Sequence, residues 1–168
     1  MPPIRSAHLA DSCGLPVFER DCGRVLLIDD LDRVLLFEGL DPGDPAAGTW
    51  WFTIGGGVEG DETPYACALR ELAEETGIEV DELDGPVLLR EAAFDFEGMH
   101  ILSHESYYVA RVAKGDIAPR LVTEIERRSV LGHRWWPIDE LVATTSAVHP
   151  DGVTIAQAAG LLADEVAS

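Results

Sequence analysis

A group of carboxylates in the first half of the chain is the feature most able to carry chemistry. Glu71, Glu74 and Glu75 fall within five residues, and spacings of three and four place their side chains on one face of a helix. Because like charges so close together repel each other, either water solvates this face or a cation compensates it. Carboxylate oxygens select hard cations, so the cation would be Mg²⁺, or Mn²⁺ in its place, rather than Zn²⁺.

The segments around the glutamates are suited to position them. Residues 55–57 are three consecutive glycines, which let the backbone approach a bound ion or phosphate closely. Thr63 predicts a helix N-cap and Gly77 a C-terminal stop, so a helix is expected over residues 64–76. Taken alone, however, a glutamate-rich helix is more often a solvated surface than a metal site.

The complete spacing of these residues is much more specific. Residues 56–78 read GGVEGDETPYACALRELAEETGI, which matches every fixed position of the pattern GX5EX7REUXEEXGU, where U is an aliphatic residue. That pattern is the signature of the Nudix hydrolases, and the chain resembles this family. Residues 51–57 and 134–141 also resemble segments of the family, so the resemblance extends over residues 17–162.

The resemblance implies an α/β fold, specifically an α/β/α sandwich with a mixed central β-sheet. It also implies an enzyme that hydrolyses a nucleoside diphosphate linked to another moiety, with water attacking phosphorus and Mg²⁺ as cofactor. On this mapping Glu74 and Glu75 are the principal metal ligands. Glu71 is a further ligand or the group that orients the attacking water.

Further roles come from the same mapping. The carbonyl of Gly55 would be an additional metal ligand, and Arg70 would pair with Glu62 to hold the loop in shape without meeting substrate. The family's general base varies, and Glu124 and Glu126 are the candidates for it in this chain. A solvated charge pair is an equally good interpretation of either glutamate.

The sequence is less specific about substrate contacts. Trp51 is a candidate to stack on a nucleobase, although core packing is the commoner role of such a residue. Phe94 and Arg134 are further candidates for contact with the substrate. The ADP-ribose group of the family tends to carry proline where this chain has Ala93, the dinucleoside polyphosphate group tends to carry tyrosine near Phe94, and the SQPWPFPxS array of the NADH group is absent. Nucleoside triphosphates, nucleotide sugars and ADP-ribose therefore all stay open as substrates.

The arginines are the candidates for side-chain contacts to phosphate, because Lys114 is the only lysine. Those next to predicted strands are Arg20, Arg33, Arg90 and Arg134.

Three rival functions are open. An isopentenyl diphosphate isomerase of this fold needs a cysteine and an acid, and the cysteines of this chain do not fall where we expect them. Cys67, inside the predicted helix, is interpreted as a buried core residue and not as a nucleophile. A nucleotide sensor of this fold typically lacks the glutamates that are all present here, and a plain acidic interaction module would make the spacing a coincidence.

Composition limits the partners and the location. The 168 residues include 12 Lys and Arg against 31 Asp and Glu, a net charge of −19. This charge disfavours nucleic acid polymers and anionic membranes but admits a nucleotide held through a divalent cation.

The cysteines and the hydropathy favour the reducing cytoplasm as the location. The chain has an odd number of cysteines, namely Cys13, Cys22 and Cys67, and no long apolar segment. We expect one domain over residues 17–168 after a flexible arm at residues 1–16, and we leave a homodimer open.

Alternation and turn signals predict the remaining elements. Residues 24–39 should form a β-hairpin around an Asp-rich turn, and residues 120–129 a loop or a loose helical turn. Further strands are predicted at 50–53, 86–90, 92–96, 104–112 and 133–136, and further helices at 138–143 and 154–166.

Overall fold

The computed structural model describes residues 4–8, 14–113 and 124–163 of the chain. The strands are β1 (Ile4–His8), β2 (Val17–Ile28), β3 (Arg33–Leu40), β4 (Thr49–Phe52), β5 (Ile54–Gly57), β6 (Asp84–Phe96), β7 (Met99–Arg111), β8 (Val130–Pro137) and β9 (Val148–His149). The helices are α1 (Pro64–Thr76), α2 (Glu124–Ser129), α3 (Ile138–Ala143) and α4 (Gly152–Ala158), with a 3₁₀ turn, η1, at Pro45–Ala47. No helix within these described residues is long and apolar enough to cross a membrane.

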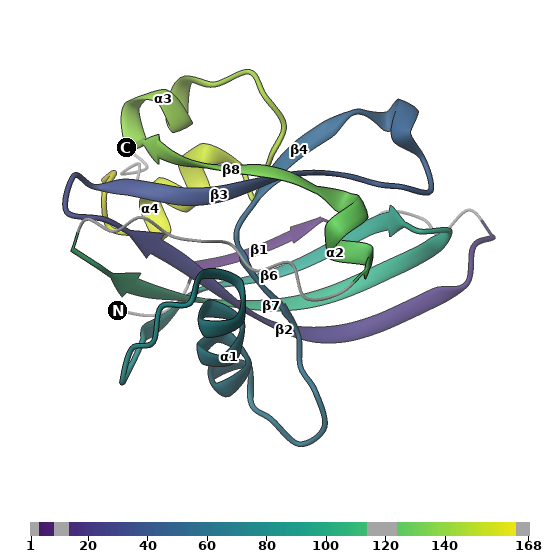
Figure 1. Cartoon of the computed structure of the whole chain (residues 1–168), viewed down its shortest axis with the longest axis horizontal. Coiled ribbons are helices and arrows are strands. Elements are labelled where there is room, and N and C mark those ends of the chain that lie inside the picture. Colours follow the sequence, from purple (N-terminus) through teal and green to yellow (C-terminus); the bar gives the residue numbers. More distant parts are fainter. Residues whose placement is uncertain (1–3, 9–13, 114–123, 164–168) are drawn as a thin grey trace.

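The strands form one mixed sheet (Figure 1). Its order is β1-β6-β7-β2-β3-β4-β9, with β5 paired to β2 and β8 paired to β3. Strands β2 and β3 are antiparallel neighbours, which confirms the predicted hairpin, whereas β2 and β7 run parallel. Because both directions occur in one sheet, the mixed α/β class expected from the sequence is confirmed.

Helix α1 packs on one face of this sheet. Successive side chains of a strand point to opposite faces, and Val25 and Leu27 of β2 point to the face that α1 covers. They belong to a buried cluster that also contains Ala68 and Leu72 of α1. The apolar stripe of α1 is therefore turned inward, and its polar side is left for other contacts.

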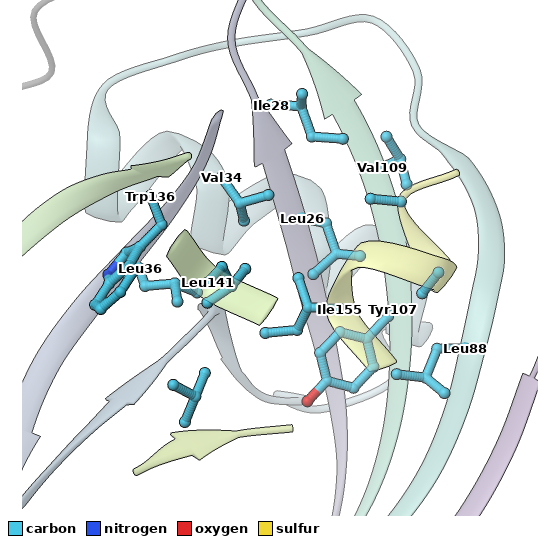
Figure 2. Close-up of a cluster of buried hydrophobic side chains, with 13 residues drawn as sticks. Leu26, Ile28, Val34, Leu36, Leu88, Tyr107, Val109, Trp136, Leu141 and Ile155 are labelled. Carbon is cyan, nitrogen blue, oxygen red and sulfur yellow. The ribbon is translucent and has the colours of Figure 1, made fainter. Parts of the chain in front are cut away.

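Helices α3 and α4 pack on the opposite face. Leu26 and Ile28 of β2 form a second buried cluster with Leu141 of α3 and Ile155 of α4, as Figure 2 shows. In Figure 1, α1 accordingly lies on one side of the sheet and α3 with α4 on the other. The expected α/β/α sandwich is thus confirmed.

Helix α1 begins and ends where the sequence predicts. The Oγ1 atom of Thr63 accepts a hydrogen bond of 3.1 Å from the N–H of Ala66, which caps the first turn. Gly77 follows the last turn with a φ of 77°, a left-handed conformation that glycine adopts at little cost. The helix expected over residues 64–76 is confirmed at both ends.

A glycine in β2 allows α1 to lie directly on the sheet. A Cβ atom at Gly23 would stand 2.1 Å from the carbonyl oxygen of Pro64 and 2.6 Å from the amide nitrogen of Ala68. Both neighbours are backbone atoms of α1 or its first turn, so they could move aside only if the helix moved. The missing side chain at Gly23 therefore sets the distance between α1 and β2.

Two segments are more ordered than the sequence suggests. Ile4–His8, part of the expected flexible arm, forms β1 and pairs in parallel with β6, while residues 1–3 and 9–13 lie outside the described part of the chain. Residues 86–90 and 92–96 were expected as separate strands but belong to the single strand β6.

Two predicted segments near the C-terminus need correction. Residues 124–129, expected as part of a loop or loose turn, form the helix α2, and residues 120–123 lie outside the described part. The final helix was expected to run to residue 166 but ends at Ala158. Gly160, with a φ of 73°, takes the left-handed conformation that follows a helix end and explains the early stop.

Candidate active site

Arg70 connects the loop after β5 to the glutamates of α1. Its Nε and Nη2 atoms donate hydrogen bonds of 3.0 and 2.6 Å to the two carboxylate oxygens of Glu62. Nη1 donates to Glu71 at 3.0 Å and Glu74 at 3.2 Å, and Nη2 also reaches the carbonyl of Gly57 at 3.2 Å. The expected fork between Arg70 and Glu62 is present, and the same guanidinium joins helix, loop and strand.

Glu75 meets the first glycine of β5 from the last turn of α1. Its Oε2 atom accepts a hydrogen bond of 3.1 Å from the backbone N–H of Gly55. Burial, together with the negative charge of Glu71, raises the pKa of Glu75 to about 8, although Gly55 and Arg24 act in the opposite direction. Within the described part of the chain Glu75 has no ion-pair partner, so a nearby cation would favour its charged form.

Glu71 lies against the second glycine of β5. Its residue exposure is only 9%, and a Cβ atom at Gly56 would stand 2.4 Å from its Oε1 atom. Burial raises the pKa of Glu71, while the charge and hydrogen bond of Arg70 act to lower it. The carboxylate of Glu71 can occupy this position because residue 56 has no side chain.

The donor set of Glu71, Glu74 and Glu75, which we call the helix glutamates, fits a hard divalent cation. As they stand, no three His, Cys, Asp or Glu side chains of the described residues are grouped closely enough to hold a metal ion, and Arg70 engages two of the helix glutamates. The chemistry nonetheless fits, because two carboxylates with raised pKa values lie together beside a glycine backbone. The atoms that would hold Mg²⁺ or Mn²⁺ are the helix carboxylates and the Gly55 carbonyl.

Glu126, one of the two predicted base candidates, acts electrostatically on Glu75. After burial and Glu71, the negative charge of Glu126 is among the contributions that raise the pKa of Glu75. Glu126 is half-buried in α2, whereas Glu124, at the start of the same helix, is exposed. The structure therefore distinguishes two residues that the sequence treats alike.

Two of the three predicted substrate residues, Trp51 and Arg134, have structural partners of their own. Trp51 packs edge to face against Trp136, with ring centroids 5.2 Å apart, at the margin of the cluster opposite α1. Arg134 is exposed, pairs with Glu140, and lies 4.1 Å from the centroid of the Trp136 ring. Phe94 is half-buried in β6. Trp51 is thus partly buried against the core, and Arg134 already has an anionic partner.

A buried arginine that the sequence pattern did not identify lies beside the site. The side chain of Arg24 is 13% exposed, and its Nε donates a hydrogen bond of 2.8 Å to Glu105. Its Nη1 donates to the carbonyl of Thr53 at 3.1 Å, and a Cβ atom at Gly55 would stand 3.0 Å from its Cδ. One sequence signal could have identified Arg24. It is a charged residue two positions before the apolar Leu26, so in a strand both side chains point to the same face of β2.

Comparison with known proteins matches the chain to one family. The family model of the NUDIX domain matches residues 19–157. Similar solved structures include a MutT protein from Methanosarcina mazei Go1, with 16% identity, a TM-score of 0.60, and coverage of 88% of this chain and 96% of that one. A MutT NUDIX hydrolase from Burkholderia pseudomallei has 21% identity, a TM-score of 0.59, and coverage of 83% and 98%. The E. coli dihydroneopterin triphosphate pyrophosphohydrolase has 23% identity, a TM-score of 0.60, and coverage of 84% and 96%. No curated protein sequence matches the chain, and the structural likenesses show a shared fold.

The fork between Arg70 and Glu62 predicts a specific dependence of stability on pH. The Arg70 hydrogen bonds lower the pKa of Glu62 from 4.5 to about 2, so the ionised carboxylate stabilises the folded state above pH 4.5 and loses this effect as the pH falls toward 2. Glu62→Gln should lower the free energy of unfolding at pH 7 by roughly 1 kcal/mol. The deficit relative to wild type should shrink below pH 4.5 in urea denaturation.

Glu59→Gln is the matched control for this measurement, since Glu59 lies 3.8 Å from Arg70 and its side chain is 75% exposed. The control should differ little from wild type at any pH. A Glu62→Gln deficit that stays constant down to pH 3 would contradict the proposed charge pairing.

Proposed function

The chain belongs to the Nudix hydrolase family, and from this premise we propose that it is a Mg²⁺-dependent pyrophosphohydrolase that also accepts Mn²⁺. Its substrate would be a nucleoside diphosphate linked to another moiety, attacked by water at phosphorus. The observation that carries the proposal is the hydrogen bond from Gly55 to Glu75 beside the buried Glu71. It brings a glycine backbone and two carboxylates with raised pKa values to one point.

The residues of this site take distinct roles in the proposal. A bound Mg²⁺ would polarise the phosphoryl oxygens, lower the pKa of a water ligand and stabilise the leaving group. Glu74 and Glu75 are its proposed principal ligands, with the carbonyl of Gly55 as an additional one. Glu71 is a further ligand or orients the water, and Arg70 holds the loop in place through its fork.

We assign the general base to Glu126. A base must lie close to the attacking water, and the charge of Glu126 acts on Glu75. Its half-buried position also limits the access of bulk water to its carboxylate. Glu124 is exposed at the start of α2, which fits the alternative role of a solvated charge.

Substrate class and location follow from more general arguments. Nucleoside triphosphates, nucleotide sugars and ADP-ribose are the candidate substrates, and the net charge of −19 makes nucleic acid polymers poor ones. A reducing cytoplasm suits Cys22 and Cys67, which are free cysteines.

The burial and the raised pKa of Cys67 disfavour the isomerase alternative. Its thiol is fully buried and donates a hydrogen bond of 3.2 Å to the carbonyl of Gly56. Burial raises the pKa of Cys67 to about 12, so the thiol stays protonated and supports packing instead of catalysis. A nucleotide sensor of the same fold is the remaining second candidate, and measured turnover separates it from the enzyme.

A substrate panel tests the proposed function. With Mg²⁺ or Mn²⁺, at least one nucleoside diphosphate derivative should yield a monophosphate product, EDTA should stop the reaction, and reaction in H₂¹⁸O should place the label on phosphorus. Glu75→Gln should lower kcat by about 100-fold or more because it removes a ligand charge, with an unchanged circular dichroism spectrum.

Glu79→Gln, just beyond the helix, replaces an exposed glutamate and is the control. No turnover of any panel member with either cation would reject the enzyme in favour of a sensor. A Glu75→Gln variant as active as the control would reject the assigned ligand.

The assignment of the base predicts unequal effects of two similar variants. Glu126→Gln should lower kcat by about 100-fold or more, the usual contribution of general base catalysis, with little change in KM. Glu124→Gln should stay within about twofold of wild type, since its side chain is solvated. Equal kcat values for the two variants, measured at saturating substrate, would move the base to another residue.

A further inference from the structure

A group of arginines lies on the sheet face opposite α1. Arg24 of β2 comes two residues before Leu26, which packs on the face that α3 and α4 cover, so alternation places Arg24 on that face and Arg20 with it. Arg90 of β6 is the register partner of Glu105 of β7. We call Arg20, Arg24 and Arg90 the arginine cluster.

A single buried carboxylate orients two members of the cluster. The side chain of Glu105 is 4% exposed and accepts hydrogen bonds of 2.8 Å from Arg24 Nε and 2.9 Å from Arg90 Nη1. Tyr107, a member of the core cluster labelled in Figure 2, donates a third bond of 3.0 Å to Glu105. The two arginine side chains are only 13% and 12% exposed, so their guanidinium groups are held in fixed places.

The donors of the cluster outnumber the acceptors. A guanidinium carries five N–H donors, yet among the described residues Arg90 uses only Nη1 and Arg24 uses only Nε and Nη1. Arg20 makes no hydrogen bond or ion pair within the same residues, and its Nε atom is buried without a partner. Of the unused donors, Arg20 Nε is the one that is buried without an acceptor among the described residues, which is costly, so the cluster is suited to receive an anion.

The arginine cluster lies next to β5, the strand whose glycines contact the helix glutamates. A Cβ atom at Gly57 would stand 3.6 Å from Arg20 Cδ, and one at Gly55 would stand 3.0 Å from Arg24 Cδ. Gly55 in turn donates its N–H to Glu75. An anion bound by the cluster would therefore lie across β5 from the proposed metal ligands.

The other arginines predicted for phosphate contacts are already neutralised. Arg33 pairs with Asp29 at 2.7 Å, and Arg134 pairs with Glu140. Of the four arginines predicted for phosphate contacts, Arg20 lies next to β5, and Arg90 shares Glu105 with Arg24; both keep unused donors. Arg24 completes this set.

We propose that Arg20, Arg24 and Arg90 form an anion subsite for a phosphate of the substrate outside the pyrophosphate bond that is cleaved. The inference rests on the proposed function and narrows it, since a nucleoside triphosphate carries such a phosphate and ADP-ribose does not. Planar guanidinium groups bind phosphate oxygens through paired hydrogen bonds. Glu105 keeps two of these groups oriented but leaves most of their donors for the substrate.

Isothermal titration calorimetry with inorganic tripolyphosphate, in the presence of EDTA, tests the subsite. Under these conditions no metal is bound and no catalysis occurs. Wild type should bind this probe, and Arg20→Gln and Arg90→Gln should each weaken binding by about tenfold or more. Arg111→Gln, which replaces an exposed arginine at the end of β7, should bind like wild type. In steady-state assays the two cluster variants should raise KM for a nucleoside triphosphate more than for ADP-ribose, with a smaller change in kcat.

The outcomes separate the subsite from the enzyme activity. If wild type hydrolyses the panel but does not bind tripolyphosphate, or if both cluster variants bind it as wild type does, the subsite is rejected and the cluster is a structural ion network. If tripolyphosphate binds through the cluster but nothing is hydrolysed, the subsite stands and the proposed activity fails. Arg20→Lys and Arg90→Lys, which keep the charge, replace any Gln variant that does not fold, and they should bind more weakly than wild type because the paired donors are lost.

Discussion

The close approach of α1 to the glycines of β2 and β5 is the constraint on which the site depends. A side chain at Gly23 would collide with backbone atoms of Pro64 and Ala68, and one at Gly56 would occupy the place of the Glu71 carboxylate. With both side chains absent, the helix lies flat on the sheet through Ala68 and Leu72. Its glutamates then meet the strand backbone directly, so the same packing that builds the core also builds the site.

Two arginines partly compensate the negative charge of this site in the folded protein. Arg70 is held by Glu62 on one side, and Arg24 by Glu105 on the other. Glu75 has neither as an ion-pair partner, and its burial beside Glu71 raises its pKa. A divalent cation is the natural complement of such a group. In the proposed function, such a cation would let a chain with a net charge of −19 bind a nucleotide, whereas the same charge disfavours a nucleic acid polymer.

Local signals were the most predictable part of the structure. The ends of α1 were predicted correctly because Thr63 and Gly77 act on their own neighbours, and the spacing of the helix glutamates identified the family. Contacts between distant segments were not predictable. Strand β1 exists through pairing with β6, and Arg24 finds its partner Glu105 across 81 residues. The final helix was predicted too long because the alanines within residues 154–166 favour helix, although Gly160 is a local stop signal of the same kind as Gly77.

Metal binding by Gly56→Ala is the most direct test of the central claim that β5 and α1 form one cation site. The added methyl group would stand 2.4 Å from Glu71 Oε1, the end of a flexible side chain, so the carboxylate should be displaced while the fold is kept. Gly132→Ala, where nothing lies within 4 Å, is the control. Titration with Mn²⁺ should show affinity reduced by about tenfold or more in Gly56→Ala and unchanged in the control. Equal Mn²⁺ affinity in wild type and Gly56→Ala would contradict the account.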